Sequence, residues 1–240
     1  MDRAKGIDVS RYQGAIDWAQ VAQAGYSFAA LRATVGDYYT DPRFTENWQG
    51  AQHNGILTTA YHVVKPGLAA DAQMMRLLDA LDDRRPDLPL ALDVELKDGC
   101  PEQQVLDVTR ACLEILNAEG YPCLVYTGAW FWNTLPVAGE WDEDADLWVA
   151  AYTAESYLLS KAWPRGWQPG NWRFWQHSNK GRVPGITGDV DLNAFNGTMD
   201  DLLRYAGKNE TPPEFQERRF LITVRGRDLR ETLVNVEEVV

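Results

Sequence analysis

The sequence predicts an α/β fold in which a ring of about eight short strands closes into a barrel. Short β-rich runs alternate with amphipathic helical stretches through most of the chain, which is typical of parallel β-α-β units. The number of runs matches the number of strands that closes a barrel around a filled interior. The 240 residues suit one barrel, although the length alone would also suit two small domains.

Eight runs rich in β-forming residues are predicted to be strands. They are Lys5–Val9, Phe28–Ala33, Leu57–Val64, Leu90–Leu96, Cys123–Thr127, Asp146–Tyr152, Trp172–His177 and Val190–Phe195. Apolar residues at helical spacing predict helices over Ala69–Arg85 and Glu102–Glu119, and Pro101 and Gly120 bound the second. The shorter predicted helices are Trp18–Ala24 and Arg43–Asn54.

The regular alternation ends in the final third of the chain. The segment between Tyr152 and Trp172 is rich in Trp, Pro and Gly, and only Lys180–Gly188 separates the last two predicted strands. That connection is too short for a crossover helix, so these two strands are not expected to form a β-α-β unit.

Residues 208–240 differ in character from the barrel predicted over 1–207. Thr211-Pro212-Pro213 has the composition of a linker, and Arg219–Arg225 and Glu231–Val240 suit two strands or a strand and a helix. A pair of strands is not stable alone. This short C-terminal appendage is therefore expected to pack on the barrel, on a second copy of the chain or on a partner.

The composition excludes some classes of function. A net charge of −12 argues against binding nucleic acid or an anionic membrane through bulk charge. No run is apolar enough to span a membrane, and the N-terminus lacks a secretory signal region, so we expect synthesis in the cytosol without an ordinary export signal. The 10 Trp and 10 Tyr residues suit a cleft that stacks on sugar rings, although core packing is expected to account for more than half.

The sequence predicts neither a metal nor a cofactor. The cysteines Cys100, Cys112 and Cys123 have neither the number of a disulfide framework nor the spacing of metal ligands. No Gly-rich phosphate loop, nucleophile elbow or zinc motif is present. His62 and His177 stand beside aromatic residues and are interpreted as hydrogen-bonded structural residues. Loop or capping roles are expected for Asp37, Asp41 and Asp98.

Two carboxylates, Asp93 and Glu95, close the predicted strand Leu90–Leu96. At positions i and i+2 of a strand they point to the same face, about 6.5 to 7 Å apart at their Cα atoms. An apolar barrel interior does not accept them, so they are expected at its open C-terminal mouth, where barrel enzymes have their active sites. The alternative is a solvated strand end or an internal salt bridge.

Two further acids, Asp8 and Asp191, lie in the first and the last predicted strands. Each alone suits a turn or a cap. Closure of the barrel makes the two strands neighbours, so the four acids are expected to form a ring with no cationic partner in the same motifs. Crowded carboxylates raise the pKa of at least one member, which creates a proton donor at neutral pH, as cleavage of a glycosidic bond requires.

The motifs that hold these acids resemble those of glycoside hydrolase family 25, the Chalaropsis-type lysozymes. The similar segments, in the family's order, are Gly6–Trp18, Ala60–His62, Ala91–Glu95, Trp175–Gln176 and Asp189–Asn193. The likeness covers residues 5 to about 206, and its specific part is the opening segment together with the Asp-x-Glu strand. The family often has Phe after Tyr-His, where this chain has Val63, and this difference removes no acid.

The resemblance implies a modified TIM-like barrel of five β/α units followed by three β-strands. It also implies an N-acetylmuramidase that cleaves the β-1,4 bond between N-acetylmuramic acid and N-acetylglucosamine in bacterial peptidoglycan. By position, Glu95 becomes the general acid/base and Asp93 stabilises the transition state or the substrate's acetamido group. Asp8 and Asp191 are implied to support that pair and to tune its protonation, and Tyr61 is implied to contact the substrate.

Three aromatic residues that end predicted interior strands, Tyr126, Tyr152 and Trp175, are candidates to line the sugar cleft, with packing in the barrel as the alternative. Another barrel glycosidase, such as a chitinase, and a non-catalytic glycan-binding barrel remain open as functions. A bacteriophage endolysin fits the expected lack of an export signal, and a bacterial autolysin is the alternative origin. The appendage 211–240 is expected to serve self-association or wall targeting.

Overall fold

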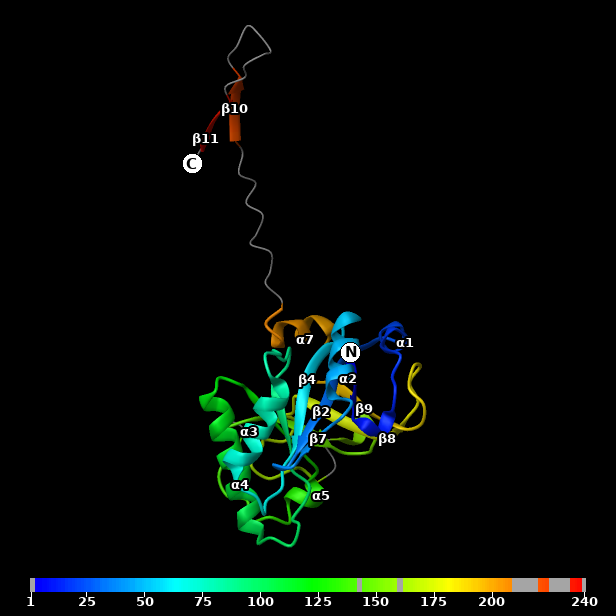
Figure 1. Ribbon diagram of the computed structural model, residues 1–240, viewed down its shortest axis with the longest axis vertical. Coiled ribbons are helices and arrows are strands. Elements are labelled where there is room, and N and C mark those ends of the chain that lie inside the picture. The colour runs from blue at the N-terminus through cyan, green and yellow to red at the C-terminus, as the bar shows by residue number, and fades with distance from the viewer. Residues whose placement is uncertain (1–2, 142–143, 159–161, 209–219, 225–233, 239–240) are drawn as a thin grey trace.

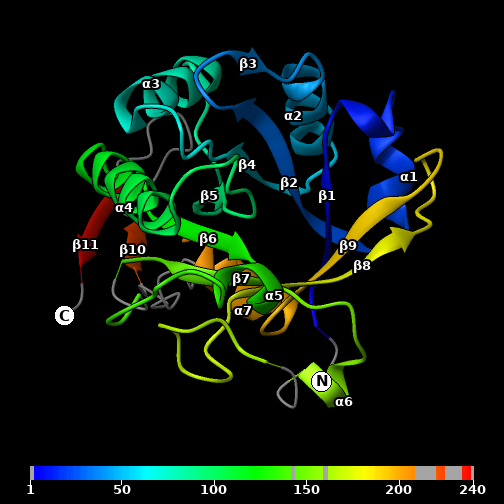
Figure 2. The same cartoon turned by 90° about the horizontal axis from the view of Figure 1, so that it is seen from below.

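The computed structural model describes residues 3–141, 144–158, 162–208, 220–224 and 234–238. Eight strands close into a barrel, because the first strand pairs with both the second and the last (Figure 2). The strands are β1 (Lys5–Val9), β2 (Tyr26–Val35), β4 (Leu57–Val63), β5 (Leu90–Asp93), β6 (Cys123–Thr127), β7 (Asp146–Ala150), β8 (Phe174–Gly181) and β9 (Val190–Phe195). The two-residue strand β3 (Tyr39–Thr40) extends the edge beside β2.

The connections divide the barrel as the sequence predicts. Strands β1, β2, β4, β5 and β6 are each followed by a helix, and the strands from β1 through β2 to β8 pair in parallel around the ring. The helices are α1 (Trp18–Gln23), α2 (Phe44–His53), α3 (Ala70–Leu81), α4 (Glu102–Ala118) and α5 (Ala129–Trp132) (Figure 1). Strand β9 runs antiparallel to both β8 and β1. Five β/α units followed by three strands are therefore confirmed.

Two helices in the last third are short. Helix α6 (Glu155–Leu158) follows β7, and helix α7 (Met199–Tyr205) follows β9. Leu202 of α7 is fully buried in the cluster that fills the barrel. Because β9 ends beside the start of β1, α7 covers the N-terminal end of the parallel strands, and the opposite end stays open.

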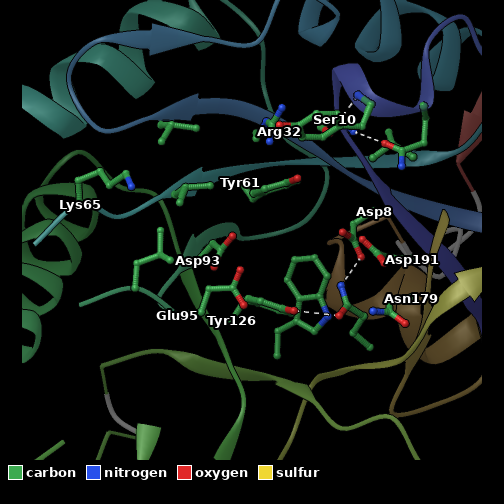
Figure 3. Close-up of a pocket in the computed structure, with 18 of the residues that line it drawn as sticks. Asp8, Ser10, Arg32, Tyr61, Lys65, Asp93, Glu95, Tyr126, Asn179 and Asp191 are labelled. Carbon is green, nitrogen blue, oxygen red and sulfur yellow. Dashed lines mark hydrogen bonds between the residues drawn. The ribbon is translucent and has the colours of Figure 1, made fainter. Parts of the chain in front are cut away.

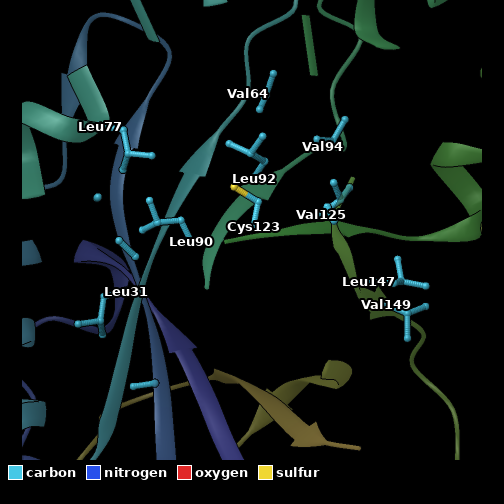
Figure 4. Packing of buried hydrophobic residues seen from close by; sticks show 14 of the residues in the cluster. Leu31, Val64, Leu77, Leu90, Leu92, Val94, Cys123, Val125, Leu147 and Val149 are labelled. Atoms are coloured by element: carbon cyan, nitrogen blue, oxygen red, sulfur yellow. The ribbon is translucent and has the colours of Figure 1, made fainter. Parts of the chain in front are cut away.

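Alternating residues of the strands supply two separate cores. Inward-facing side chains fill the barrel with aromatic and small residues, among them Phe28, Trp148, Phe174 and Phe195. Outward-facing side chains such as Leu31, Leu90, Leu92 and Val125 pack against residues of the helices, including Leu77 (Figure 4). A filled interior leaves the C-terminal mouth of the barrel as the place for a cavity.

The predicted end of the fourth strand at Leu96 was wrong. Strand β5 ends at Asp93, and the backbone of Val94 makes one more hydrogen bond, to Tyr126 of β6. On the other side, β4 ends at Val63, so the chain beyond Val94 has no partner strand there and turns at Lys97. Glu95 consequently follows the strand rather than lying within it.

The C-terminal segment contains a pair of strands. Strands β10 (Phe220–Val224) and β11 (Val234–Glu238) pair in antiparallel register, which selects the two-strand alternative for the appendage. The predicted linker at Thr211-Pro212-Pro213 lies outside the described residues. Over the part of the chain that the structure describes, no helix has both the length and the apolar character needed to cross a membrane.

His62 of β4 is a structural residue, as the sequence suggests. It is fully buried, and its Nε2 lies 3.2 Å from Gln73 Oε1 while its Nδ1 lies 2.7 Å from Thr34 Oγ1. The Gln73 oxygen also accepts from the backbone of Lys65, and its amide nitrogen donates to backbone carbonyls, so it is the imidazole Nε2 that donates. Every polar group of the neutral ring is thereby satisfied.

This burial predicts a loss of stability in acid. Burial lowers the pKa of His62 to about 4, whereas an unfolded histidine titrates near 6.5. The unfolded chain therefore binds a proton first, and the free energy of unfolding falls by up to about 3 kcal/mol as pH decreases from 6.5 through 4. Urea unfolding of the wild type and of His62→Gln at pH 7 and 4.5 tests this. An equal change with pH in both proteins would contradict it.

Candidate active site

The C-terminal ends of the parallel strands surround an open cavity of about 450 Å³ (Figure 3). All four acids singled out in the sequence lie in its wall. The lining residues are Asp8, Val9, Ser10, Tyr12, Gln13, Arg32, Val35, Tyr61, Val63, Lys65, Asp93, Glu95, Leu96, Tyr126, Trp148, Tyr152, Gln176, Asn179 and Asp191. Asp93 and Glu95 stand on one side, and Asp8 and Asp191 lie together on the other.

Barrel alternation aims these side chains at the cavity. In β1 the flanking Ile7 and Val9 are buried in the outer core, so Asp8 between them faces inward. In β5 Leu92 is buried in the outer core, and Asp93 next to it faces the cavity. Each acid stands at the cavity end of its strand or just beyond it, because deeper inward positions are occupied by the apolar side chains that fill the barrel.

Asp8 and Asp191 are direct neighbours, as the closure argument predicts. They are opposite partners in the antiparallel ladder between β1 and β9. Asp8 Oδ2 accepts hydrogen bonds from Gln176 Nε2 at 2.9 Å and from Asn193 Nδ2 at 2.7 Å. Burial, followed by the charge of Asp191, raises the pKa of Asp8 well above its usual range.

Asp93 and Glu95 differ in their surroundings. Asp93 is only 9% exposed, and its Oδ1 makes no hydrogen bond with the residues that the structure describes. Its pKa is raised by burial, then by the charges of Glu95 and Asp8. Glu95 is partly exposed to the cavity, and its pKa is raised by burial and then by the charge of Asp191. The site therefore retains protons at a pH where isolated carboxyls would have lost them.

A family model described as "Glycosyl hydrolases family 25" matches residues 7–186, which include Asp8, Asp93 and Glu95. The chain belongs to this family. As a family 25 member it is a glycoside hydrolase, and the resemblance of its sequence motifs to the family is confirmed.

Curated relatives include proteins with and without an assigned activity. The hydrolase is 37% identical over 218 residues to "Uncharacterized protein YegX" of Escherichia coli K12, covering 86% of this chain and 75% of that protein. It is 34% identical over 218 residues to "Lysozyme M1" of Streptomyces globisporus, covering 84% of this chain and 71% of that one.

Solved structures share the fold of the hydrolase. A bacterial lysozyme from Streptomyces coelicolor superposes with a TM-score of 0.77 at 32% identity, covering 86% of this chain and 98% of that one. A family 25 glycosyl hydrolase from Bacillus anthracis gives a TM-score of 0.74 at 25% identity over 86% and 95% of the two chains. The modified TIM-like barrel is thus confirmed by comparison as well as by topology.

Two cations in the hydrolase's cavity wall were missed by sequence reasoning. Arg32 of β2 pairs through Nε with the buried carboxylate of Asp41 at 2.8 Å, and Lys65 pairs with Asp98 at 2.9 Å. Both act to lower the pKa of Asp93 against the larger effect of its burial. Arg32 lies in β2 and Lys65 in the turn after β4, both outside the motifs that contain the acids. A search of those motifs therefore could not reveal these cations.

Asp41 does more than cap a loop. It accepts from the backbone nitrogens of Arg11 at 3.1 Å and Arg43 at 3.0 Å, as a capping residue does, and it also holds Arg32. Lys65 likewise gives Asp98 an ion-pair partner in the loop after β5. These two acids support the cations at the cavity rather than reaching it themselves.

Three of the four aromatic candidates line the cavity of the hydrolase. Tyr61, Tyr126 and Tyr152 belong to its wall, together with Trp148, which sequence reasoning did not select. Trp148 lies four residues before Tyr152 in the predicted strand Asp146–Tyr152, so strand alternation could have identified it, although β7 itself ends at Ala150. Tyr126 is buried, whereas Tyr152 is 57% exposed at the mouth.

The expectation that Trp175 lines the cleft was wrong. Its indole faces the outer side of β8, where Nε1 donates to Ala151 O at 2.7 Å and the ring packs against Trp172 and His177. Gln176, the next residue, faces the cavity instead. Neighbours in a strand point to opposite faces, and the curvature of the closed barrel decides which of the two is inside.

Proposed function

We propose that this family 25 hydrolase is a lysozyme that cleaves the β-1,4 bond between N-acetylmuramic acid and N-acetylglucosamine in bacterial peptidoglycan. The observation that carries the proposal is the set of four carboxyl groups around one open cavity, among them Glu95, whose pKa is raised above that of an isolated carboxyl. The cavity walls also offer tyrosine rings suited to stacking on sugars.

Glu95 is the proposed general acid/base. It follows β5, reaches the cavity and is only partly buried, so a glycosidic oxygen can approach its carboxyl. Burial and the charge of Asp191 raise its pKa, which favours the protonated form. That form can give its proton to the glycosidic oxygen, so that the leaving group departs as an alcohol rather than as an alkoxide.

Asp93 is the proposed electrostatic partner. Its carboxyl is buried beside Glu95, and its Oδ1 is left without a hydrogen bond among the described residues. Such an oxygen is available to an N–H group or to positive charge that develops on the sugar during bond cleavage. Arg32 and Lys65 favour the ionised form that this task requires.

We expect net retention at the anomeric carbon, assisted by the substrate's own acetamido oxygen. In this scheme Glu95 first donates a proton to the leaving oxygen and then takes one from water, while Asp93 orients the acetamido group. NMR of the first-formed product should therefore show the β-anomer. Initial release of the α-anomer would rule retention out.

Mass spectrometry of digested peptidoglycan tests the proposed reaction. A muramidase leaves N-acetylmuramic acid at each new reducing end, and that sugar is the expected result. New ends of N-acetylglucosamine would contradict the bond assignment. Rapid cleavage of chitin oligomers with no cleavage of peptidoglycan would favour a chitinase, and wall binding without new reducing ends would favour a glycan-binding barrel.

The segment 211–240 is proposed to serve self-association or attachment to the cell wall, separately from the chemistry. Among the residues that the structure describes, those that line the cavity all precede residue 207. A chain ending at Lys208 should hydrolyse short soluble muropeptides within a few-fold of the full chain, with changes confined to light scattering or to binding of intact walls. A truncated chain that folds but does not cleave the short substrate would show that the segment contributes to the active site.

A further inference from the structure

The carboxyl of Asp8 is held from one side by two amides whose orientations are set by other side chains. Trp148 Nε1 lies 2.8 Å from Asn193 Oδ1, and an indole N–H can only donate. The Asn193 oxygen therefore accepts, and its nitrogen donates to Asp8 Oδ2 at 2.7 Å. This assignment fixes Oδ2 of Asp8 as an acceptor.

Gln176 reinforces the same oxygen. Its Oε1 lies 2.8 Å from the hydroxyl of Tyr126 and 2.9 Å from that of Tyr152, and both hydroxyls donate to it. Its Nε2 then donates to Asp8 Oδ2 at 2.9 Å. Two N–H groups thus occupy Oδ2, so a proton on Asp8 has its place on the other oxygen.

We infer that Gln176 is a positioning residue that, together with Asn193, confines the proton of the Asp8–Asp191 pair to the side of Asp8 that faces Asp191. Asp191 lies opposite Asp8 in the β1–β9 ladder, and the two carboxyl groups lie together in the cavity wall (Figure 3). A protonated Asp8 that donates to Asp191 leaves the pair with one negative charge, located on Asp191.

This arrangement links Gln176 to Glu95, the proposed acid/base. The effect of Gln176 on catalysis therefore rests on the proposed function, whereas its hydrogen bond to Asp8 does not. The charge of Asp191 is, after burial, the second cause of the raised pKa of Glu95. Gln176 thus acts on Glu95 through Asp8 and Asp191, without needing to touch the substrate.

Several other charged or titratable groups surround the pair and enter its pH dependence. They are Arg32 of β2, Tyr61 of β4, Asp93 and Glu95 at the end of β5, Tyr126 of β6, Tyr152 after β7, and Lys180 and Asp189 beside Asp191. All remain in place in a variant changed at Gln176 alone, so a comparison with the wild type isolates the effect of this amide.

Gln176→Glu is the variant that tests the inference, because its behaviour depends on protonation. While the introduced carboxyl is protonated, it donates its O–H to Asp8 and accepts from both tyrosines, as the amide of Gln176 does. Once ionised, the introduced carboxylate can only accept hydrogen bonds, so it cannot donate to Asp8 Oδ2 and repels that oxygen. We therefore expect kcat near the wild-type value at pH 5, falling about tenfold or more below wild type by pH 8, with KM little changed.

Asn193→Asp provides an independent second variant. Once the introduced carboxyl is ionised, it no longer donates a hydrogen bond to Asp8, but it still accepts one from Trp148 Nε1. Gln103→Glu is the matched control: it adds the same charge on the exposed face of α4, where the amide contacts Asp107. The control should keep the wild-type pH profile. A loss of activity by the same factor at every pH in both test variants, or no loss at any pH, would overturn the inference.

Thermal unfolding supplies a readout that does not need activity. The difference in Tm between Gln176→Glu and wild type should be small at pH 5 and grow toward pH 8, because the second buried carboxylate becomes charged. A difference in Tm independent of pH would also overturn the inference. If the wild type fails to cleave peptidoglycan while the Tm difference follows pH as expected, the proposed function fails and the positioning role of Gln176 stands.

Discussion

Glu95→Gln is expected to lower kcat on peptidoglycan by about 10²- to 10⁴-fold, the usual contribution of a general acid/base. Glutamine matches glutamate in size and keeps the polar contacts of the cavity rim, but it cannot deliver a proton to the leaving oxygen. The loss should appear in kcat much more than in KM, because the binding surface of the cavity is unchanged. Turnover of purified peptidoglycan, followed by the release of reducing ends, measures the effect.

The folded state should be almost unaffected by this change. Glu95 is partly exposed and follows β5 rather than pairing within it, so the barrel does not depend on it. Glu114→Gln, on the exposed face of α4, is the matched control and should retain full activity. An activity of Glu95→Gln within about threefold of wild type, far below the contribution of a general acid, would remove Glu95 from its proposed role.

Asp93→Asn is expected to affect activity and stability in opposite directions. Removal of a preorganised charge at the reacting centre typically lowers kcat by about 10²- to 10³-fold. Asp93 is buried, and its pKa is raised chiefly by that burial. Ionisation of this carboxyl is therefore less favourable in the folded protein than in the unfolded chain. Asparagine has the same shape and no charge, which removes the penalty.

The sign of the effect on stability follows from proton linkage. An unfolded aspartate titrates near 3.9, and the folded carboxyl keeps its proton to higher pH. The contribution of Asp93 to stability is therefore full below about pH 3.9 and is lost as pH rises through the raised pKa. Each unit of pKa difference corresponds to about 1.4 kcal/mol, or about 3–6 °C in Tm for a chain of this size.

Thermal unfolding at pH 7 and at pH 3.5 measures this prediction. Asp93→Asn should melt above wild type at pH 7, and the advantage should shrink at the lower pH. Asp83→Asn, an exposed aspartate after α3, should show no such difference. A variant that keeps full activity, or that melts below wild type at pH 7, would show that the carboxylate serves the fold rather than the reaction.

Local sequence patterns carried most of the information about the barrel. Three predicted strands, Lys5–Val9, Cys123–Thr127 and Val190–Phe195, match the structure at both ends. The helix predicted over Glu102–Glu119 differs from α4 by one residue, because its apolar spacing and its flanking Pro101 and Gly120 are signals read along the chain. Strand ends that depend on a neighbouring strand, such as that of β5, were less accurate.

By itself, the sequence determined the barrel, its change from β/α units to plain strands, and the four acids at its mouth. Those features depend on alternation and spacing within single segments, together with the closure of the first strand onto the last. Only the tertiary structure decided that Gln176 rather than Trp175 faces the cavity, and that Arg32 and Lys65 stand beside Asp93. The physical reason is that a strand has two equivalent faces and an ion pair needs no nearness in sequence, so both depend on how distant strands meet around the ring.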